Sequence, residues 1–216
     1  DTNNLPFLRE IAGYRRPVLV STAMCTMGEV REAVDTLREA GARDVVVMQC
    51  TGNYPAALED SNLRVMNSYR SELGCLVGYS DHTPDLINPI AATALGACVY
   101  EKHVTLDRQM PGPDHRMSLD PNELRATIQA IRQTERALGR DDKHVLSSEE
   151  ENRRKLRKSL VTATAIPRGT PIVATMLAIK RPGTGLPPGR LPDVIGRTLR
   201  AAAAVDTVLT DDMFQS

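Results

Sequence analysis

Residues 78–83 read GYSDHT, and residues 100–119 read YEKHVTLDRQMPGPDHRMSL. Each segment begins in a short apolar strand pattern and places a histidine just past it, His82 in the first segment and His103 in the second. The stretch between them, Leu86–Gly96, has helical composition. The pattern therefore predicts one strand, helix, strand unit with a histidine at the exit of each strand.

Two imidazoles that leave adjacent parallel strands at the same level can hold one ion between them, because neighbouring strands lie about 4.8 Å apart. A histidine that follows a strand can also be a loop residue that bonds only to the backbone. The spacing of His82 and His103 therefore leaves two interpretations open, a metal site and a pair of structural loop residues.

The alternation of strand and helix patterns occurs four times within residues 1–139. The strand patterns are short apolar runs that suit strands buried on both faces of a parallel sheet, namely Val18–Ser21, Val45–Cys50, Leu76–Tyr79 and Val99–Lys102. The helix patterns each end at a glycine, a common stop signal, and are Met27–Ala40, Leu63–Leu73, Leu86–Leu95 and Pro121–Leu138. Four such units are half of an eight-fold barrel, which takes about 250 residues when complete. We therefore expect the chain to be a fragment that lacks the first half of a barrel.

The composition changes after Gly139. Residues 140–157 are polar and charged and predict a linker. Residues 158–216 contain short strand patterns broken by turns rich in proline and glycine, at Ser159–Ala163, Thr170–Val173 and Leu177–Lys180. This part of the chain is predicted to be a small, mostly-β domain.

The composition argues against several classes of function. The 27 Lys and Arg residues balance the 27 Asp and Glu residues, so the charge indicates neither a nucleic-acid partner nor a membrane surface. Aromatic residues make up 3% of the chain, too few for a surface that stacks bases. The sequence shows no run of about 18 apolar residues and no export signal. Four cysteines without a CxxC pair fit buried free thiols in a reducing compartment, and we expect a cytoplasmic protein.

Several of these motifs resemble the sialic acid (N-acetylneuraminate) synthase family. They are GYSDHT, EKH-x-T-L-D-R, PGPDH-x-x-SL, PVLVSTAM from Pro17, QCTGNYP from Gln49, RKSL and KRPGTG, and together they extend over essentially all 216 residues. The resemblance implies an α/β fold, the C-terminal half of a TIM barrel with four β/α units, followed by a small antifreeze-like (SAF, β-clip) domain. It also implies a transferase that condenses phosphoenolpyruvate with an N-acetylated amino sugar, such as N-acetylmannosamine, to give a sialic-type (nonulosonic) acid and phosphate.

The resemblance implies that His82 and His103 bind a divalent cation, Mn²⁺ or Mg²⁺, although two imidazoles would equally admit zinc. The cation would act as a Lewis acid on the sugar aldehyde. Asp114, in PGPDH, matches a third catalytic position, a carboxylate that accepts hydrogen bonds from sugar hydroxyls. Asp81 and Glu101 flank the histidines and are candidates either to orient them or to form salt bridges.

The resemblance assigns substrate contacts to four further residues. Ser21 and Ser80 match positions that donate hydroxyls to the phosphate, although a serine at a strand end can also cap a turn. Tyr54 matches a sugar-contacting position, with packing under a loop as the alternative. Arg181 matches an arginine that reaches across a domain-swapped homodimer, where its guanidinium can grip an acyl carbonyl. An exposed arginine in a turn is the alternative there.

Two departures from the family pattern leave the acceptor sugar open. Ala23 replaces a glycine, and Gly52 stands where a hydrogen-bonding side chain is common. Synthases of legionaminic acid, pseudaminic acid or sialic acid 9-phosphate are therefore alternatives. The first barrel half supplies a glutamate and lysines in the family, so we expect no catalysis by this polypeptide alone. A non-catalytic alternative is a fragment whose SAF tail is an ice-binding or protein-interaction module. A third alternative is a different barrel enzyme, such as a metal aldolase. That alternative would give no reason for the KRPGTG motif.

Overall fold

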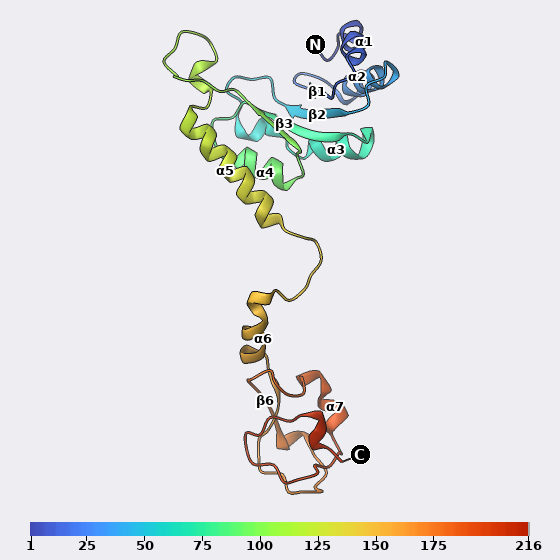
Figure 1. The fold of residues 1–216 in the computed structure, drawn as a ribbon, viewed down its shortest axis with the longest axis vertical. Helices are drawn as coiled ribbons and strands as arrows, with labels where there is room; N and C mark the ends of the chain where they lie inside the picture. The colour runs from blue at the N-terminus through green and yellow to red at the C-terminus, as the bar shows by residue number, and fades with distance from the viewer. Residues whose placement is uncertain (216) are drawn as a thin grey trace. The chain divides into compact units, whose positions relative to one another are not determined.

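The computed structural model describes residues 1–215, which form two compact units, residues 1–140 and residues 141–215. In the first unit, four parallel strands lie side by side in chain order (Figure 1). They are β1 (Val18–Ser21), β2 (Val45–Cys50), β3 (Leu76–Asp81) and β4 (Val99–Lys102). The four predicted strands are therefore confirmed, and β3 continues two residues further than expected.

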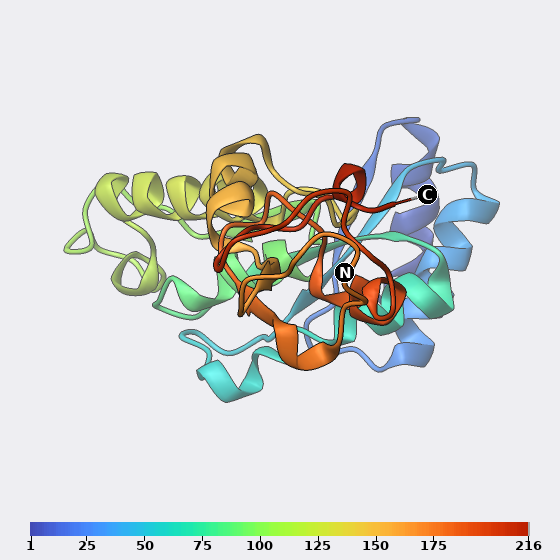
Figure 2. The same ribbon diagram turned by 90° about the horizontal axis from the view of Figure 1, so that it is seen from below.

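Helices follow the strands in the same order, and they are α2 (Met27–Glu39), α3 (Val65–Leu73), α4 (Ile87–Ala94) and α5 (Pro121–Leu138). Each agrees with its prediction to within two residues. In both views the blue helix α2 lies at the β1 end of the sheet and the yellow-green α5 at the β4 end (Figures 1 and 2). α4 packs on α5. Helix order therefore repeats strand order, as it does in a barrel built of β/α units.

Local sequence signals fix where these helices begin and end. Thr26 begins α2 with a capping box, in which its side chain accepts from the Glu29 amide while Glu29 accepts from the Thr26 amide. Asp120 and Glu123 form the same arrangement at α5. Gly74 ends α3 in the left-handed conformation, with φ of 59°, which glycine adopts without steric cost.

One helix of this unit, α1 (Leu5–Gly13), was not predicted. Its sequence carries the usual signals, because the Asn4 side chain accepts from the Phe7 amide and a proline stands in the first turn. Leu8 and Ala12 are its buried residues, and α1 packs on α2.

The two faces of the sheet differ. The outer face, covered by the helices, carries the core, in which Val30, Val34 and Leu37 of α2 pack with Val47 and Tyr79 of the sheet. The opposite face, here called the inner face, carries alternate residues of each strand. Leu19 and Leu76 on that face are 48% and 62% exposed. The inner face is therefore the one that the helices leave uncovered.

The second unit has its own core and a small antiparallel sheet of β5 (Ser159–Thr162) and β6 (Leu177–Lys180). Two short helices belong to it, α6 (Glu150–Leu156), within the predicted linker, and α7 (Leu191–Val194). The core residues are Leu160, Ile166, Ile172, Leu186, Val194, Leu199, Ala203, Leu209 and Phe214. Within residues 1–215, the structure has no helix both long and apolar enough to span a membrane.

The strand predicted at Thr170–Val173 is wrong. No strand forms there, because Pro171 has no amide to donate to a ladder. Ile172 made the segment apolar, and it is fully buried in the core of the second unit, with its amide bound to the Arg197 carbonyl at 2.9 Å.

Asp120→Ala should lower the free energy of unfolding of the first unit by about 1 kcal/mol, because two amides at the start of α5 lose their acceptor. Urea unfolding followed by circular dichroism measures this loss. Asp120→Asn is the matched control and should unfold like the wild type, since asparagine caps equally well. Equal stability of the alanine variant and the wild type would contradict the role of this cap.

Candidate active site

The ends of β3 and β4 bring two histidines together on the inner face. Register pairs Ser80 with Glu101, and each histidine lies two residues further along its strand direction. The ring centroids of His82 and His103 are 5.3 Å apart, with an interplanar angle of 71°. The two rings that the sequence placed at neighbouring strand exits are thus in contact at one end of the sheet.

The loop that follows β2 holds His82 from two sides. The Thr51 carbonyl lies 2.7 Å from His82 Nδ1, and the Ala56 amide donates to the His82 carbonyl at 2.9 Å. Cys50 Sγ lies 3.8 Å from the same ring nitrogen. Since a carbonyl oxygen only accepts, Nδ1 carries a proton in this arrangement. In the neutral ring, Nε2 is then the nitrogen whose lone pair can bind a cation.

His103 is held by the loop that carries PGPDH. The Leu119 amide donates to the His103 carbonyl and the Thr105 amide donates to the Leu119 carbonyl, both at 2.9 Å. This folds the loop back, so that Asp114 Oδ2 lies 3.8 Å from His103 Nδ1. His115 places its Nδ1 2.7 Å from the Thr105 hydroxyl. All three predicted catalytic residues, His82, His103 and Asp114, therefore lie at this end of the sheet.

Tyr54 covers the two histidine rings. Its ring centroid lies 4.1 Å from that of His82 and 5.6 Å from that of His103, and the residue is 53% exposed. Partial burial, followed by the nearby charges of Cys50, Asp114 and Glu101, raises the pKa of Tyr54 above its ordinary value. The phenol is therefore neutral near pH 7 and can donate a hydrogen bond to a molecule bound at the histidines.

The predicted phosphate-binding serines lie deeper on the inner face. Ser80 donates to Glu101 Oε1 at 2.7 Å, so this hydroxyl already serves a carboxylate. In the register of the sheet, Ser21 pairs with Met48, and Met48 pairs with Gly78. Gly78 is two residues before Ser80, so the two serines lie at different levels of the sheet. Arg181 belongs to the second unit, where its Nε donates to the Leu156 carbonyl at 3.2 Å.

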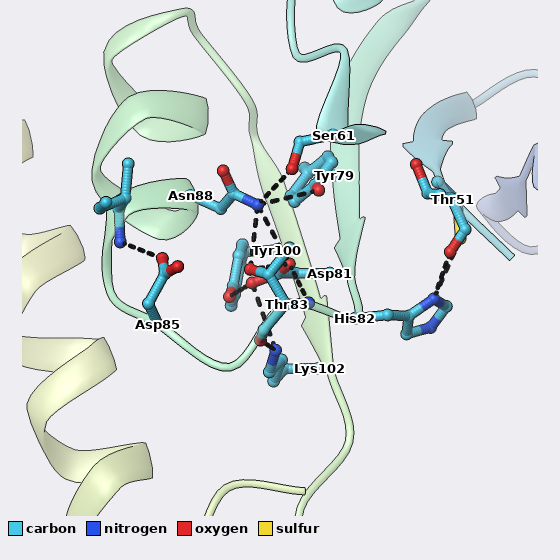
Figure 3. A network of polar contacts seen from close by, with 12 residues as sticks. Thr51, Ser61, Tyr79, Asp81, His82, Thr83, Asp85, Asn88, Tyr100 and Lys102 are labelled. Carbon is cyan, nitrogen blue, oxygen red and sulfur yellow. Dashed lines mark hydrogen bonds and ion pairs between the residues drawn. The ribbon is translucent and has the colours of Figure 1, made fainter. Parts of the chain in front are cut away.

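A buried polar network on the outer face, centred on Asp81, the residue before His82, was not predicted (Figure 3). Asp81 Oδ2 accepts from the Tyr100 hydroxyl at 2.5 Å and pairs with Lys102 Nζ at 3.3 Å. Asn88 of α4 donates to Asp81 Oδ1 at 3.3 Å and also binds Ser61, Tyr79 and Thr83. Burial raises the pKa of Tyr79 to about 12, so its hydroxyl stays protonated.

The network settles the two interpretations of the flanking carboxylates. Asp81 faces the helices and forms a salt bridge, and Glu101 accepts from Ser80, so within residues 1–215 these carboxylates bind groups other than the histidine rings. Strand alternation could have shown this, because Asp81 shares the outer face with Tyr79, two residues earlier. Lys102 is the register partner of Asp81 across β3 and β4.

The donor set fits a cation held in an open site. His82 offers Nε2, and its Nδ1 is oriented by a carbonyl, an outer contact typical of histidines that bind metals. Among residues 1–215, no group of three or more His, Cys, Asp or Glu side chains could hold a metal ion. A cation bound at the two imidazoles would have its other coordination positions open to water or substrate oxygen.

Comparison with known proteins agrees with the fold. The NeuB family model matches residues 1–143, and the SAF domain model matches residues 157–215. The chain belongs to the NeuB family. The suspected sialic acid synthase resemblance is confirmed, as is the fold class, half of a TIM barrel followed by a SAF domain.

Several curated relatives of this NeuB-family chain are named as acid synthases. It is 37% identical to the N,N'-diacetyllegionaminic acid synthase of Legionella pneumophila, over 97% of this chain and 60% of the relative. It is 34% identical to the human N-acetylneuraminate-9-phosphate synthase, over 99% of this chain and 60% of the relative. The pseudaminic acid synthase of Campylobacter jejuni is also 34% identical, over 91% of this chain and 57% of the relative. The chain thus spans about 60% of the length of these relatives.

Solved structures share the fold of this chain. The spore coat polysaccharide biosynthesis protein spsE of Bacillus subtilis superposes with a TM-score of 0.61 at 31% identity, over 100% of this chain and 65% of that one. The N-acetylneuraminic acid synthetase of Leptospira borgpetersenii, solved with citrate, superposes with a TM-score of 0.65 at 28% identity, over 70% of this chain and 53% of that one.

Asn88→Ala should lower the free energy of unfolding of the first unit by about 2 kcal/mol or more, because the buried oxygens of Ser61, Thr83 and Asp81 share the two amide hydrogens of Asn88 and lose them. Urea unfolding measures the change. Asn67→Ala, which removes an exposed amide from α3, is the control and should stay within about 0.5 kcal/mol of the wild type. Equal losses in both variants would mean that the network adds no stability.

Proposed function

We propose that this chain forms part of an enzyme that condenses phosphoenolpyruvate with an N-acetylated amino sugar to give a sialic-type acid and phosphate. The observation that carries the proposal is the contact of His82 and His103, 5.3 Å apart at the strand exits under the ring of Tyr54. The names of the relatives support it, since they are synthases of legionaminic, pseudaminic and phosphorylated N-acetylneuraminic acids.

In the proposed reaction, the methylene carbon of phosphoenolpyruvate attacks the aldehyde carbon of the sugar and forms the new carbon–carbon bond. Water then adds to the carbon that carries the phosphate, and inorganic phosphate leaves with cleavage of the C–O bond. His82 and His103 would hold Mn²⁺ or Mg²⁺, which supplies Lewis acidity at the aldehyde oxygen.

The remaining residues bind and orient the substrates. Tyr54, neutral near pH 7, donates a hydrogen bond to the sugar, and Asp114 accepts hydrogen bonds from its hydroxyls. Ser21 provides a hydroxyl for the phosphate. Ser80 can serve the phosphate only if it releases Glu101, because its single proton is already donated there.

Arg181 extends the proposal to a homodimer in which the second unit of one subunit closes the site of its partner. The guanidinium would hold the acyl group of the sugar. Its exposure in the second unit supports this role, since the side chain binds only a backbone carbonyl at 3.2 Å among the contacts that the structure describes. A cytoplasmic location remains a prediction from the free cysteines.

His82→Ala should reduce phosphate release at least about 100-fold in the full-length protein that carries this chain, because losing only an outer partner of a metal ligand costs about 10–100-fold. The assay follows phosphate from phosphoenolpyruvate, N-acetylmannosamine and Mn²⁺. His144→Ala is the matched control, an exposed histidine of the second unit, and should keep the wild-type rate. Residues 1–216 alone should release no phosphate.

Turnover of His82→Ala at the wild-type rate would refute the metal role. Competition among N-acetylmannosamine, its 6-phosphate and a diacetamido sugar in the same assay identifies the acceptor. If no acceptor supports release by the wild type, the enzyme proposal fails and an interaction module becomes the better interpretation.

Arg181→Ala should lower kcat/KM for the amino sugar by about tenfold or more, because a hydrogen bond to a charged group contributes a free energy that corresponds to about that factor. KM for phosphoenolpyruvate should not change. Mixed dimers test the exchange between subunits. If the tails cross over, combining Arg181→Ala subunits with His82→Ala subunits rebuilds one intact site per dimer and restores activity. No restoration in mixed dimers would place Arg181 in its own subunit's site.

A further inference from the structure

A buried ion pair joins the two strands immediately before the two histidines. Asp81 precedes His82, Lys102 precedes His103, and the two charged residues are register partners across β3 and β4. Their side chains are 0% and 4% exposed, and Lys102 Nζ lies 3.3 Å from Asp81 Oδ2. Because successive side chains point to opposite faces of a strand, the ion pair lies behind the sheet while the histidines lie in front.

The contacts of this pair bracket His82 on both sides. Asp81 Oδ1 accepts from the Thr83 amide at 2.9 Å and from its hydroxyl at 2.8 Å. Lys102 Nζ donates to the Thr83 carbonyl, and Tyr100 donates to Asp81 Oδ2 at 2.5 Å. The residues before and after His82 are therefore both bound to β4, the strand that carries His103 (Figure 3).

Stability alone does not account for a charged pair at this place. Removing two charges from water costs several kcal/mol per ion, and apolar residues of the same volume often stabilise a fold equally well. Asn88 and Tyr79 already bind α4 to the outer face of the sheet by neutral hydrogen bonds. What the ion pair adds is a fixed relation between the exits of two strands. It acts where β3 ends and the backbone ladder no longer holds the chain.

We propose that Asp81, Tyr100 and Lys102 form a clamp that sets the separation of His82 and His103 and so tunes their affinity for the cation. The three are positioning residues, since they act from the outer face through the backbone of residues 82 and 83. The inference rests on the proposed function in one respect, that these histidines hold the cation.

The test measures Mn²⁺ binding without substrate, by the electron paramagnetic resonance signal of free Mn²⁺, in the full-length protein that carries this chain. Asp81→Asn combined with Lys102→Met removes both charges together, so no unpaired charge remains buried. The dissociation constant should rise about tenfold, the lower end of the effect of outer partners of metal ligands. The midpoint of urea unfolding should stay near that of the wild type.

Tyr100→Phe is a milder variant that removes one hydroxyl from Asp81, and it should weaken Mn²⁺ binding in the same direction. Tyr69→Phe is its matched control, because it removes a buried hydroxyl that binds Thr22 and Gln49, away from β4. The control should bind Mn²⁺ within twofold of the wild type. If the double variant fails to fold, the two tyrosine variants decide the question.

The outcomes separate the clamp from the function on which it rests. A wild type that binds Mn²⁺, with Tyr100→Phe and the double variant binding equally tightly, overturns the clamp and leaves the metal site standing. Equal weakening in Tyr100→Phe and Tyr69→Phe also overturns it, as a general effect of lost buried hydroxyls. A wild type without Mn²⁺ affinity overturns the metal role of the histidines and the clamp with it.

Discussion

The parallel pairing of β3 with β4 is the constraint on which the candidate site depends. Register places Ser80 beside Glu101 and Asp81 beside Lys102, so the next residues, His82 and His103, leave the sheet at the same level. A shift of one residue in this register would exchange the faces of the two strands, because the side-chain period of a strand is two. The buried contacts of Asp81 with Tyr100 and Lys102 belong to one register only.

The two faces of the sheet divide stability from chemistry. On the outer face, the helices bury an apolar core that ends, toward the strand exits, in the polar network of Asn88, Tyr79 and Asp81. On the inner face, the same strands present Ser80, Glu101 and, beyond them, the histidines. This agrees with parallel barrels in general, in which functional groups gather at the C-terminal ends of the strands. In this chain, loops complete the site, since Tyr54 and Asp114 come from the segments after β2 and β4.

The second unit depends on different interactions. Its two strands are short, and its core residues come mostly from segments outside them, such as Ile166, Ile172 and Leu199. Isolated bridges and single backbone hydrogen bonds connect these segments, including the pair between Ile166 and Ala203 at 2.9 Å in both directions. Such a unit can present an exposed turn like that of Arg181 on a scaffold that packs independently of the barrel half.

The sequence by itself determined the elements that rest on local signals. Strand periodicity, glycine stops and the capping boxes at Thr26 and Asp120 act between residues close in the chain, so the strands and four of the helices were predictable. Motif resemblance supplied His82 and His103. Strand alternation places Asp81 on the face opposite His82, but only the tertiary structure decided that its partner there is Lys102. It also decided that Ile172 fills a core instead of extending a strand. Those outcomes depend on register and on contacts between distant segments, which no local pattern encodes.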